Sequence, residues 1–178
     1  MLRKNLPFLS GYDDEQLYYY FNTVRKSFIR VEADELTYNF HTALRYEVEK
    51  KAIAGEAKVA ELPELWNDTF EEYLGMRPKN DAEGVLQDVH WSGGSFGYFA
   101  TYTLGNVVLG MIWHKMRDGE LVRGAVGRGD LMELRGWLGR GIHRYGATYA
   151  PKDLQMRVFG EAYNPERFLK YLNTKFVG

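Results

Sequence analysis

The sequence contains no cysteine, and none of its histidines forms a local metal-binding pair. Without cysteine the 178-residue chain has no disulfide and no thiolate metal ligand, a composition that fits a reducing cytoplasm. No two histidines lie three or four residues apart and none precedes a glutamate, so the helical HExxH pair of zinc hydrolases is absent. The P-loop and GxGxxG patterns are missing too. The four histidines are His41, His90, His114 and His143.

The charges also exclude several kinds of partner. Lys and Arg number 23 against 24 Asp and Glu, a net charge of -1, so no nucleic-acid or membrane-surface partner is predicted. From Val89 to Trp113 no Asp, Glu, Lys or Arg occurs, a length that can cross a bilayer. The glycines and polar side chains of this segment favour instead a buried loop that leads into a buried helix. The N-terminus lacks the apolar stretch of a signal peptide, and we expect a soluble, cytoplasmic protein.

The helix start and stop signals predict an all-α fold in a single domain, residues 1–178. Asp13 and Asp14 suit the start of a first helix, and a second is predicted from Ala33 to Ala54. Later helices are predicted over 63–75, 100–116, 130–146, 151–160 and 164–176. Within a long irregular segment between residues 76 and 99, the alternation from Val85 to Trp91 predicts one short strand.

That irregular segment is rich in glycine and aromatic residues. Connections of more than about a dozen residues are uncommon in compact domains and are often functional. Tyrosines and glycines suit a surface that faces a ligand, but a loop that simply packs into the core explains them equally well. The residues in question are His90, Trp91, Gly93, Gly94, Phe96, Gly97, Tyr98, Phe99 and Tyr102.

Polar side chains follow one another at steps of three or four residues before this segment. If the second predicted helix begins early enough, one of its faces carries all of these side chains: Arg30, Asp34, Tyr38, His41 and Arg45. Such a stripe can line a cleft. An ordinary hydrated helix face with an Arg30–Asp34 ion pair is the alternative that spacing favours.

Two longer motifs resemble a known family. Residues 29–34, IRVEAD, resemble the IRxxAD signature of the carboxypeptidase Taq family, and residues 84–91, GVLQDVHW, resemble its GxxQDxHW signature. The resemblance covers essentially the whole chain. It implies the C-terminal helical part of a neurolysin-like or angiotensin-converting-enzyme-like zinc peptidase fold. The implied activity is that of a thermostable zinc metallocarboxypeptidase, which releases C-terminal amino acids from peptides with broad specificity.

The family's HPF, DxRxT and HExxH signatures, and the glutamate that completes its zinc site, do not occur in this chain. The resemblance therefore implies a truncated enzyme whose zinc ligands lie upstream. We expect the chain alone to hold no metal and to be inactive. Its expected partners are peptide substrates, a second copy of itself and an N-terminal half that contains HExxH. One alternative is half of a split enzyme that needs that N-terminal half, and the other is a non-catalytic scaffold derived from the peptidase.

The resemblance also implies roles for individual residues. His90, Gly93, Gly94 and Tyr102 form the spacing His-x-x-Gly-Gly-x7-Tyr, which is similar to that of neurolysin-type oligopeptidases. It implies that His90 and Tyr102 face the tetrahedral intermediate, with Tyr98 as the alternate phenol. We expect the side chains of Gln87 and Asp88 to orient the imidazole. Arg30 is the candidate ligand for the terminal carboxylate of the substrate, since a guanidinium matches a carboxylate in a bidentate pair.

Overall fold

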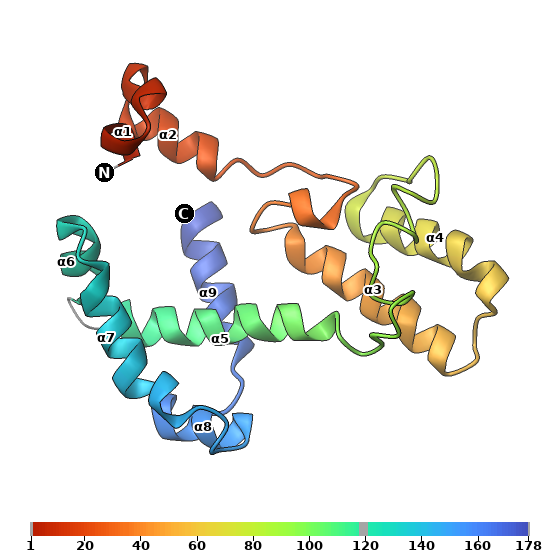
Figure 1. Cartoon of the computed structure of the whole chain (residues 1–178). Helices are drawn as coiled ribbons and strands as arrows, with labels where there is room; N and C mark the ends of the chain where they lie inside the picture. The colour runs from red at the N-terminus through yellow and green to blue at the C-terminus, as the bar shows by residue number, and fades with distance from the viewer. Residues whose placement is uncertain (1, 118–120, 178) are drawn as a thin grey trace. The chain divides into compact units, whose positions relative to one another are not determined.

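The computed structural model describes residues 2–117 and 121–177, which form helices and turns without a strand (Figure 1). The predicted all-α fold is therefore confirmed. Contacts divide the chain into two compact units, residues 2–104 and the residues from Gly105 onward. Each unit is described by itself. No helix among the described residues is long and apolar enough to cross a bilayer.

The first unit begins with short helices and is built on one long helical pair. The Asp13 carboxylate caps α2, accepting from the Gln16 backbone N–H at 2.7 Å, while the Gln16 side chain accepts from the Asp13 N–H. The predicted start is confirmed. The elements of this unit are α1 (Leu2–Asn5), η1 (Pro7–Gly11), α2 (Asp14–Phe21), η2 (Arg30–Glu32), α3 (Tyr38–Ile53), η3 (Val59–Glu61), α4 (Leu62–Leu74) and the start of α5 (Ala100–Arg117).

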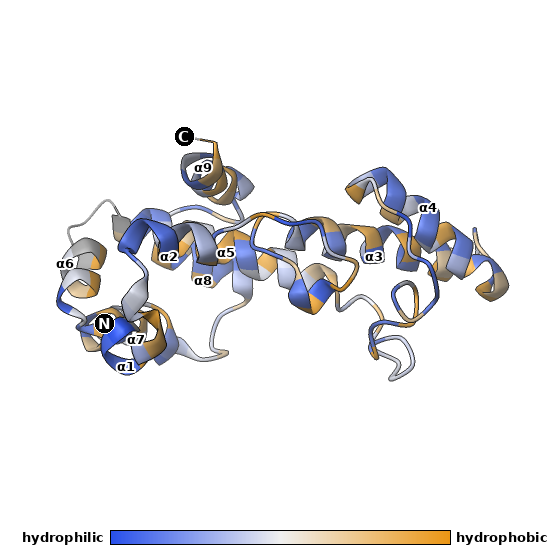
Figure 2. Ribbon diagram, turned by 90° about the horizontal axis from the view of Figure 1, so that it is seen from above, coloured by the Kyte–Doolittle hydropathy of each residue, from blue (hydrophilic) through white to orange (hydrophobic). Residues whose placement is uncertain are grey.

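The core of this unit lies between α3 and α4, which pack side by side (Figure 1). Both helices mix hydrophobic and hydrophilic residues along their length (Figure 2). Their buried apolar side chains recur every four residues, so that each helix presents one apolar stripe to the other. These side chains are Leu44 and Val48 on α3 and Trp66, Phe70 and Leu74 on α4. The polar residues of the site adjoin this stripe on α3, where His41 packs against Phe70 and Arg45 against Trp66.

Helix α3 begins at Tyr38, five residues after the predicted Ala33. The cause is Asp34, whose carboxylate accepts from the backbone N–H groups of Leu36 and Thr37, both at 2.9 Å, and from the Thr37 hydroxyl. The chain turns here before the helix starts. Burial would raise the pKa of Asp34, but these donors and the Arg25 N–H lower it. The predicted stripe therefore does not lie on one helix.

The strand predicted over Val85–Trp91 is wrong, because this segment is a series of turns. The Leu86 N–H donates to Asp81 O at 2.8 Å and the Gln87 N–H to Gly84 O at 3.2 Å. Amides bonded within the loop are not available to a neighbouring strand. The alternating pattern also fails to mark a buried face, since both Leu86 and Val89 are more than 70% exposed.

The second unit contains the rest of α5 and four further α-helices. Three of the predicted starts are confirmed: Asp130 and Asn164 cap α7 and α9 through their side chains, and Pro151 opens α8. Helix α7 ends at Gly141, before the predicted Gly146. Helix α6 was not predicted, because its two glycines weaken the helical pattern. The elements are α6 (Leu121–Arg128), α7 (Leu131–Gly141), η4 (His143–Tyr145), α8 (Pro151–Phe159) and α9 (Pro165–Phe176).

One glycine sets the distance between α5 and α9 within this unit. A Cβ atom at Gly110 would lie 2.6 Å from the Phe168 Cα and 2.7 Å from its backbone N. Backbone atoms cannot move aside as the end of a side chain can, so the helices touch only because residue 110 has no side chain. At Gly105, on the same helix, a Cβ would meet nothing within 4 Å.

The two glycines give a matched test of this packing. Gly110→Ala should lower the free energy of unfolding by roughly 1–3 kcal/mol, the usual cost of overpacking a core. Gly105→Ala should instead raise it by up to about 1 kcal/mol, because alanine favours the helix. Urea unfolding of both variants measures the difference. Equal effects of the two substitutions would show that α5 and α9 are not in this contact.

Candidate functional site

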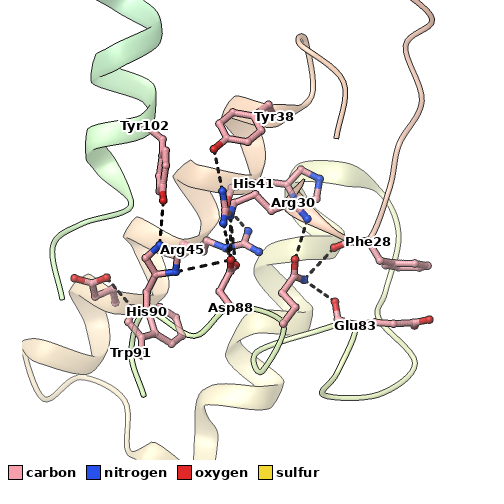
Figure 3. A network of polar contacts seen from close by, with 12 residues as sticks. Phe28, Arg30, Tyr38, His41, Arg45, Glu83, Asp88, His90, Trp91 and Tyr102 are labelled. Atoms are coloured by element: carbon pink, nitrogen blue, oxygen red, sulfur yellow. Dashed lines mark hydrogen bonds and ion pairs between the residues drawn. The ribbon is translucent and has the colours of Figure 1, made fainter. Parts of the chain in front are cut away.

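One carboxylate, that of Asp88, joins the two arginines of the predicted stripe (Figure 3). Asp88 Oδ1 accepts from Arg30 Nη2 at 2.7 Å and from Arg30 Nε at 3.1 Å. Asp88 Oδ2 accepts from Arg45 Nε at 2.6 Å. The Asp88 and Arg30 side chains are nearly buried and that of Arg45 is fully buried. The loop, η2 and α3 are therefore fastened to one another through a single side chain.

Aromatic rings surround the two guanidinium groups. The Cζ atom of Arg45 lies 4.6 Å from the centre of the Trp66 ring, and that of Arg30 lies 4.9 Å from the Tyr102 ring. Both distances fall within the range of cation–π contacts. Arg30 Nη1 also donates to the Tyr38 hydroxyl at 2.9 Å. Arg30 thus uses Nε, Nη1 and Nη2 within the protein, and its expected ion pair with Asp34 is not formed.

Burial and the charge of the partner act in opposite directions on the pKa values of Asp88, Arg45 and Arg30. Burial would raise the pKa of Asp88, but the hydrogen bond from Arg30 and the positive charge of Arg45 hold the pKa below its usual value. Burial lowers the pKa of Arg45 to about 10, although Asp88 opposes the change. Burial acts likewise on Arg30, but its bonds to Asp88 and Tyr38 raise the pKa above the ordinary value. All three groups are consequently charged at neutral pH.

Gln87 ties the loop to the backbone of residues 28–30 and to the loop's own backbone at Glu83. Its Oε1 accepts from the Arg30 backbone N–H at 2.9 Å, while its Nε2 donates to Phe28 O at 3.0 Å and to Glu83 O at 2.7 Å. These contacts use the carboxamide on the backbone around Arg30, whereas the sequence predicted a contact with the imidazole of His90. Gln87 therefore places Arg30 beside Asp88.

His90 and Tyr102, predicted to act together, lie side by side. His90 Nε2 is 3.1 Å from the Tyr102 hydroxyl, and the ring of Phe99 packs 4.4 Å from the imidazole, centre to centre. His90 Nδ1 lies 3.9 Å from Asp88 Oδ1, which is beyond hydrogen-bonding distance. Asp88 therefore lies beside the imidazole without the direct hydrogen bond that would orient the ring.

The remaining predicted residues lie on the exposed side of the same loop. The Tyr98 ring is centred 5.7 Å from the His90 ring, and the residue is 49% exposed. Gly93 and Gly94 are exposed, and Gly94 has φ +76°, a conformation that favours glycine. The loop and the first turn of α5 thus bring together the imidazole of His90, the phenols of Tyr98 and Tyr102, and the exposed backbone of Gly93 and Gly94.

The expectation from the sequence that no GxSxG motif is present was wrong, because residues 93–97, GGSFG, fit this pattern of serine hydrolases. That motif requires a strand immediately before the serine and a helix immediately after it. Here the residues before Ser95 form turns. The structural context of a serine nucleophile is therefore missing.

Sequence reasoning also missed Glu49, which lies on α3 and is buried. Its Oε2 accepts from Trp91 Nε1 at 2.8 Å, and its Oε1 accepts from the Gly97 backbone N–H. The spacing did contain a signal, because His41, Arg45 and Glu49 follow one another at steps of four. Extending the polar stripe by one turn would have included it.

His41 is fully buried against Phe70, with 5.5 Å between the ring centres. Burial and then the positive charges of Arg45 and Arg30 lower its pKa to about 4. Within residues 2–117 and 121–177, neither ring nitrogen of His41 has a hydrogen-bond partner. Protonation would add a third positive charge beside two guanidinium groups, so this imidazole stays neutral at physiological pH.

The described residues do not fit a zinc site. Among them, no three His, Cys, Asp or Glu side chains come close enough together to hold a metal ion. Asp88 and His90 lie near each other, but both oxygens of Asp88 accept from guanidinium groups. We therefore assign no metal ligand among the described residues.

Comparisons with known proteins give the family to which the chain is similar. The sequence pattern of the family described as "Carboxypeptidase Taq (M32) metallopeptidase" matches residues 1–176. Thermostable carboxypeptidase 1 of Pyrococcus furiosus is 42% identical over 178 residues, covering 99% of this chain and 36% of its own length. Carboxypeptidase 1 of Bacillus subtilis is also 42% identical, covering 87% of this chain and 31% of its own.

Solved structures of carboxypeptidases also match nearly the whole of this chain. A structure of the Pyrococcus furiosus carboxypeptidase matches 98% of this chain and 35% of its own with a TM-score of 0.91 at 43% identity. Trypanosoma cruzi metallocarboxypeptidase 1 matches 99% of this chain and 38% of its own, also at 0.91, with 32% identity. The chain thus spans about a third of the length of the relatives it matches.

Because His41 is neutral when buried, the stability of the first unit should depend on pH. An unfolded histidine takes up a proton below about pH 6.5, whereas the folded imidazole does so only near pH 4. Between these values the unfolded state binds more protons, so stability falls as the pH falls. The expected slope approaches about 1.4 kcal/mol per pH unit, or about 3 kcal/mol in total.

Urea unfolding at several pH values between 7 and 4, followed by NMR of the Trp66 indole, measures this slope. His41→Leu should remove most of it, because leucine has no proton to gain. His143→Leu is the matched control, since His143 is exposed, and it should leave the slope unchanged. A slope that persists in His41→Leu would mean that another group is responsible.

Proposed function

Because this chain belongs to the carboxypeptidase Taq (M32) metallopeptidase family, we propose that it forms the C-terminal, substrate-facing third of a zinc carboxypeptidase that removes C-terminal amino acids from peptides with broad specificity. The observation that carries this proposal is the His90–Tyr102 pair, 3.1 Å apart, in which His90 lies on the loop fastened by Asp88 and Tyr102 on the first turn of α5. An imidazole and a phenol side by side suit an oxygen that gains negative charge.

The chemistry we assign to this chain is stabilisation of that oxygen. When a water adds to a peptide carbonyl, the carbonyl oxygen becomes an oxyanion, and donors already in place lower the barrier. With its proton on Nε2, the His90 imidazole donates to the Tyr102 hydroxyl oxygen, and the Tyr102 O–H is then free to donate to the substrate. Tyr98, in ring contact with both residues, is the alternate phenol.

For Arg30 two roles are proposed, and they differ in their test. The contacts with Asp88 and Tyr38 support a role in bracing the loop. The second role, binding the terminal carboxylate of the substrate, would use the N–H groups of Nη1 and Nη2 that Tyr38 and Asp88 do not occupy. The substrate role predicts a raised KM for peptides with a free C-terminal carboxylate and little change for amidated peptides.

The metal would come from outside this chain. We propose that zinc is held by an N-terminal half containing HExxH, which activates the attacking water when the metal is bound. In this proposal the chain alone is inactive, and it joins that half, as one polypeptide or two, and a second copy of itself. The exposed aromatic side chains of α2 support an uncovered contact surface. They are Tyr18, Tyr19, Tyr20 and Phe21.

The proposal is tested with the chain joined to, or mixed with, the N-terminal half of a family enzyme. Tyr102→Phe should lower kcat about 100- to 1000-fold, while KM changes little, because the phenol acts only as charge develops on the oxygen. Tyr98→Phe is the matched control and should cost clearly less. Hydrolysis of a C-terminally unblocked peptide measures both.

Other results of this experiment would change the residue assignment or the proposed function. A large loss in Tyr98→Phe with near-normal turnover in Tyr102→Phe would transfer the role to Tyr98. Near-normal turnover in both would remove the oxyanion assignment. A correctly joined protein without any peptidase activity would instead favour the alternative function, a non-catalytic scaffold.

A further inference from the structure

Glu49 holds the loop of the candidate site at two points through one carboxylate. The residue is only 7% exposed, and its carboxylate accepts from two N–H groups of the loop: Trp91 Nε1, 2.8 Å from Oε2, and the Gly97 backbone N–H, which donates to Oε1. A buried carboxylate that accepts two such bonds is strongly fixed, since hydrogen bonds to a charged acceptor are about twice as strong as neutral ones.

The two held residues are the sequence neighbours of two site residues. Trp91 directly follows His90, and Gly97 directly precedes Tyr98. Gly97 has φ +75°, a left-handed conformation that favours glycine, at the point where its N–H meets Glu49. One carboxylate on α3 therefore fixes both ends of the segment that separates the imidazole from the exposed phenol.

The backbone bonds inside this segment do not reach Gly97. Gly93 N–H donates to Val89 O, Gly94 N–H to Trp91 O and Ser95 N–H to His90 O, while beyond Gly97 the carbonyls of Tyr98 and Phe99 accept from Thr101 and Tyr102 at the start of α5. The indole of Trp91 is wedged edge-on against Trp66 and Phe99, with both ring centres at 5.9 Å. That wedge anchors the first end of the segment in the core, whereas Gly97 has no side chain with which to anchor the second end.

We propose that Glu49 is a positioning residue that sets His90 and Tyr98 at their mutual distance by binding Trp91 and Gly97 at once. The catalytic meaning of this role rests on the proposed function, but the clamp itself is a property of this chain alone. Its requirement is two acceptor oxygens. Glutamine has the same shape but only one, and its NH2 group would face the second N–H donor.

The clamp is measured in the chain alone by hydrogen exchange of the Trp91 indole and the Gly97 amide. Glu49→Gln should keep the helical circular dichroism, speed exchange at one or both sites by about tenfold or more, and weaken the nuclear Overhauser contact between the His90 and Tyr98 rings. Glu49→Asp, which keeps two acceptors, should restore part of the protection. Glu47→Gln, on the same helix but paired with Lys50, is the matched control and should change neither.

Unchanged exchange and ring contact in a folded Glu49→Gln chain would overturn the proposal. If that variant fails to fold, the unaltered chain decides: its Trp91 indole must exchange much more slowly than that of the more exposed Trp113, and equal rates would refute the clamp. In the joined enzyme, Glu49→Gln should lower kcat about ten- to a hundredfold with KM nearly unchanged. Loss of the clamp without an effect on kcat would contradict its catalytic role and leave the clamp itself standing, whereas the proposed function is decided separately by Tyr102→Phe.

Discussion

The site depends on one buried carboxylate that neutralises two arginines from different segments. Asp88 fixes η2 through Arg30 and α3 through Arg45, and both guanidinium groups lie against aromatic rings of the core. Removing charges from water is costly unless they are paired at close range, so each of the three groups requires the other two. The arrangement still carries one uncompensated positive charge, which agrees with the low pKa of the neighbouring His41. The constraint is therefore electrostatic, and it acts where the fold has no regular secondary structure to hold the chain.

The loop uses this constraint to present reactive groups outward. Residues 76–99 contain no helix or strand, yet Asp88, Gln87 and the carboxylate of Glu49 fasten them to η2 and α3. Between these fixed points His90 meets Tyr102, the third residue of α5, and Tyr98 remains half exposed. A long loop that is rigid in this way keeps hydrogen-bond donors in place before a substrate arrives, which is the condition for electrostatic catalysis.

Much of the fold and part of the candidate site could be predicted from the sequence, and the predictions that failed did so for physical reasons. Caps such as Asp13 and Asn164 act within a few residues, so the helix starts they mark were confirmed. The family resemblance predicted that His90 and Tyr102 act together. Residue spacing alone had left their roles undecided. The strand over Val85–Trp91 and the early start of α3 were wrong because side-chain acceptors and local turns used the backbone N–H groups. The partners of Arg30 could not be predicted either, since Asp88 and Tyr38 reach it only in the folded chain.

The most direct test of the account is the free energy of unfolding of Asp88→Asn compared with that of Asp81→Asn, an exposed aspartate in the same loop. Asparagine keeps the shape of the side chain but leaves two buried guanidinium groups without a counter-charge. The account predicts a loss of roughly 3–5 kcal/mol for Asp88→Asn and less than about 0.5 kcal/mol for Asp81→Asn. A loss below about 1 kcal/mol in a folded Asp88→Asn chain would contradict the claim that this carboxylate holds the site together.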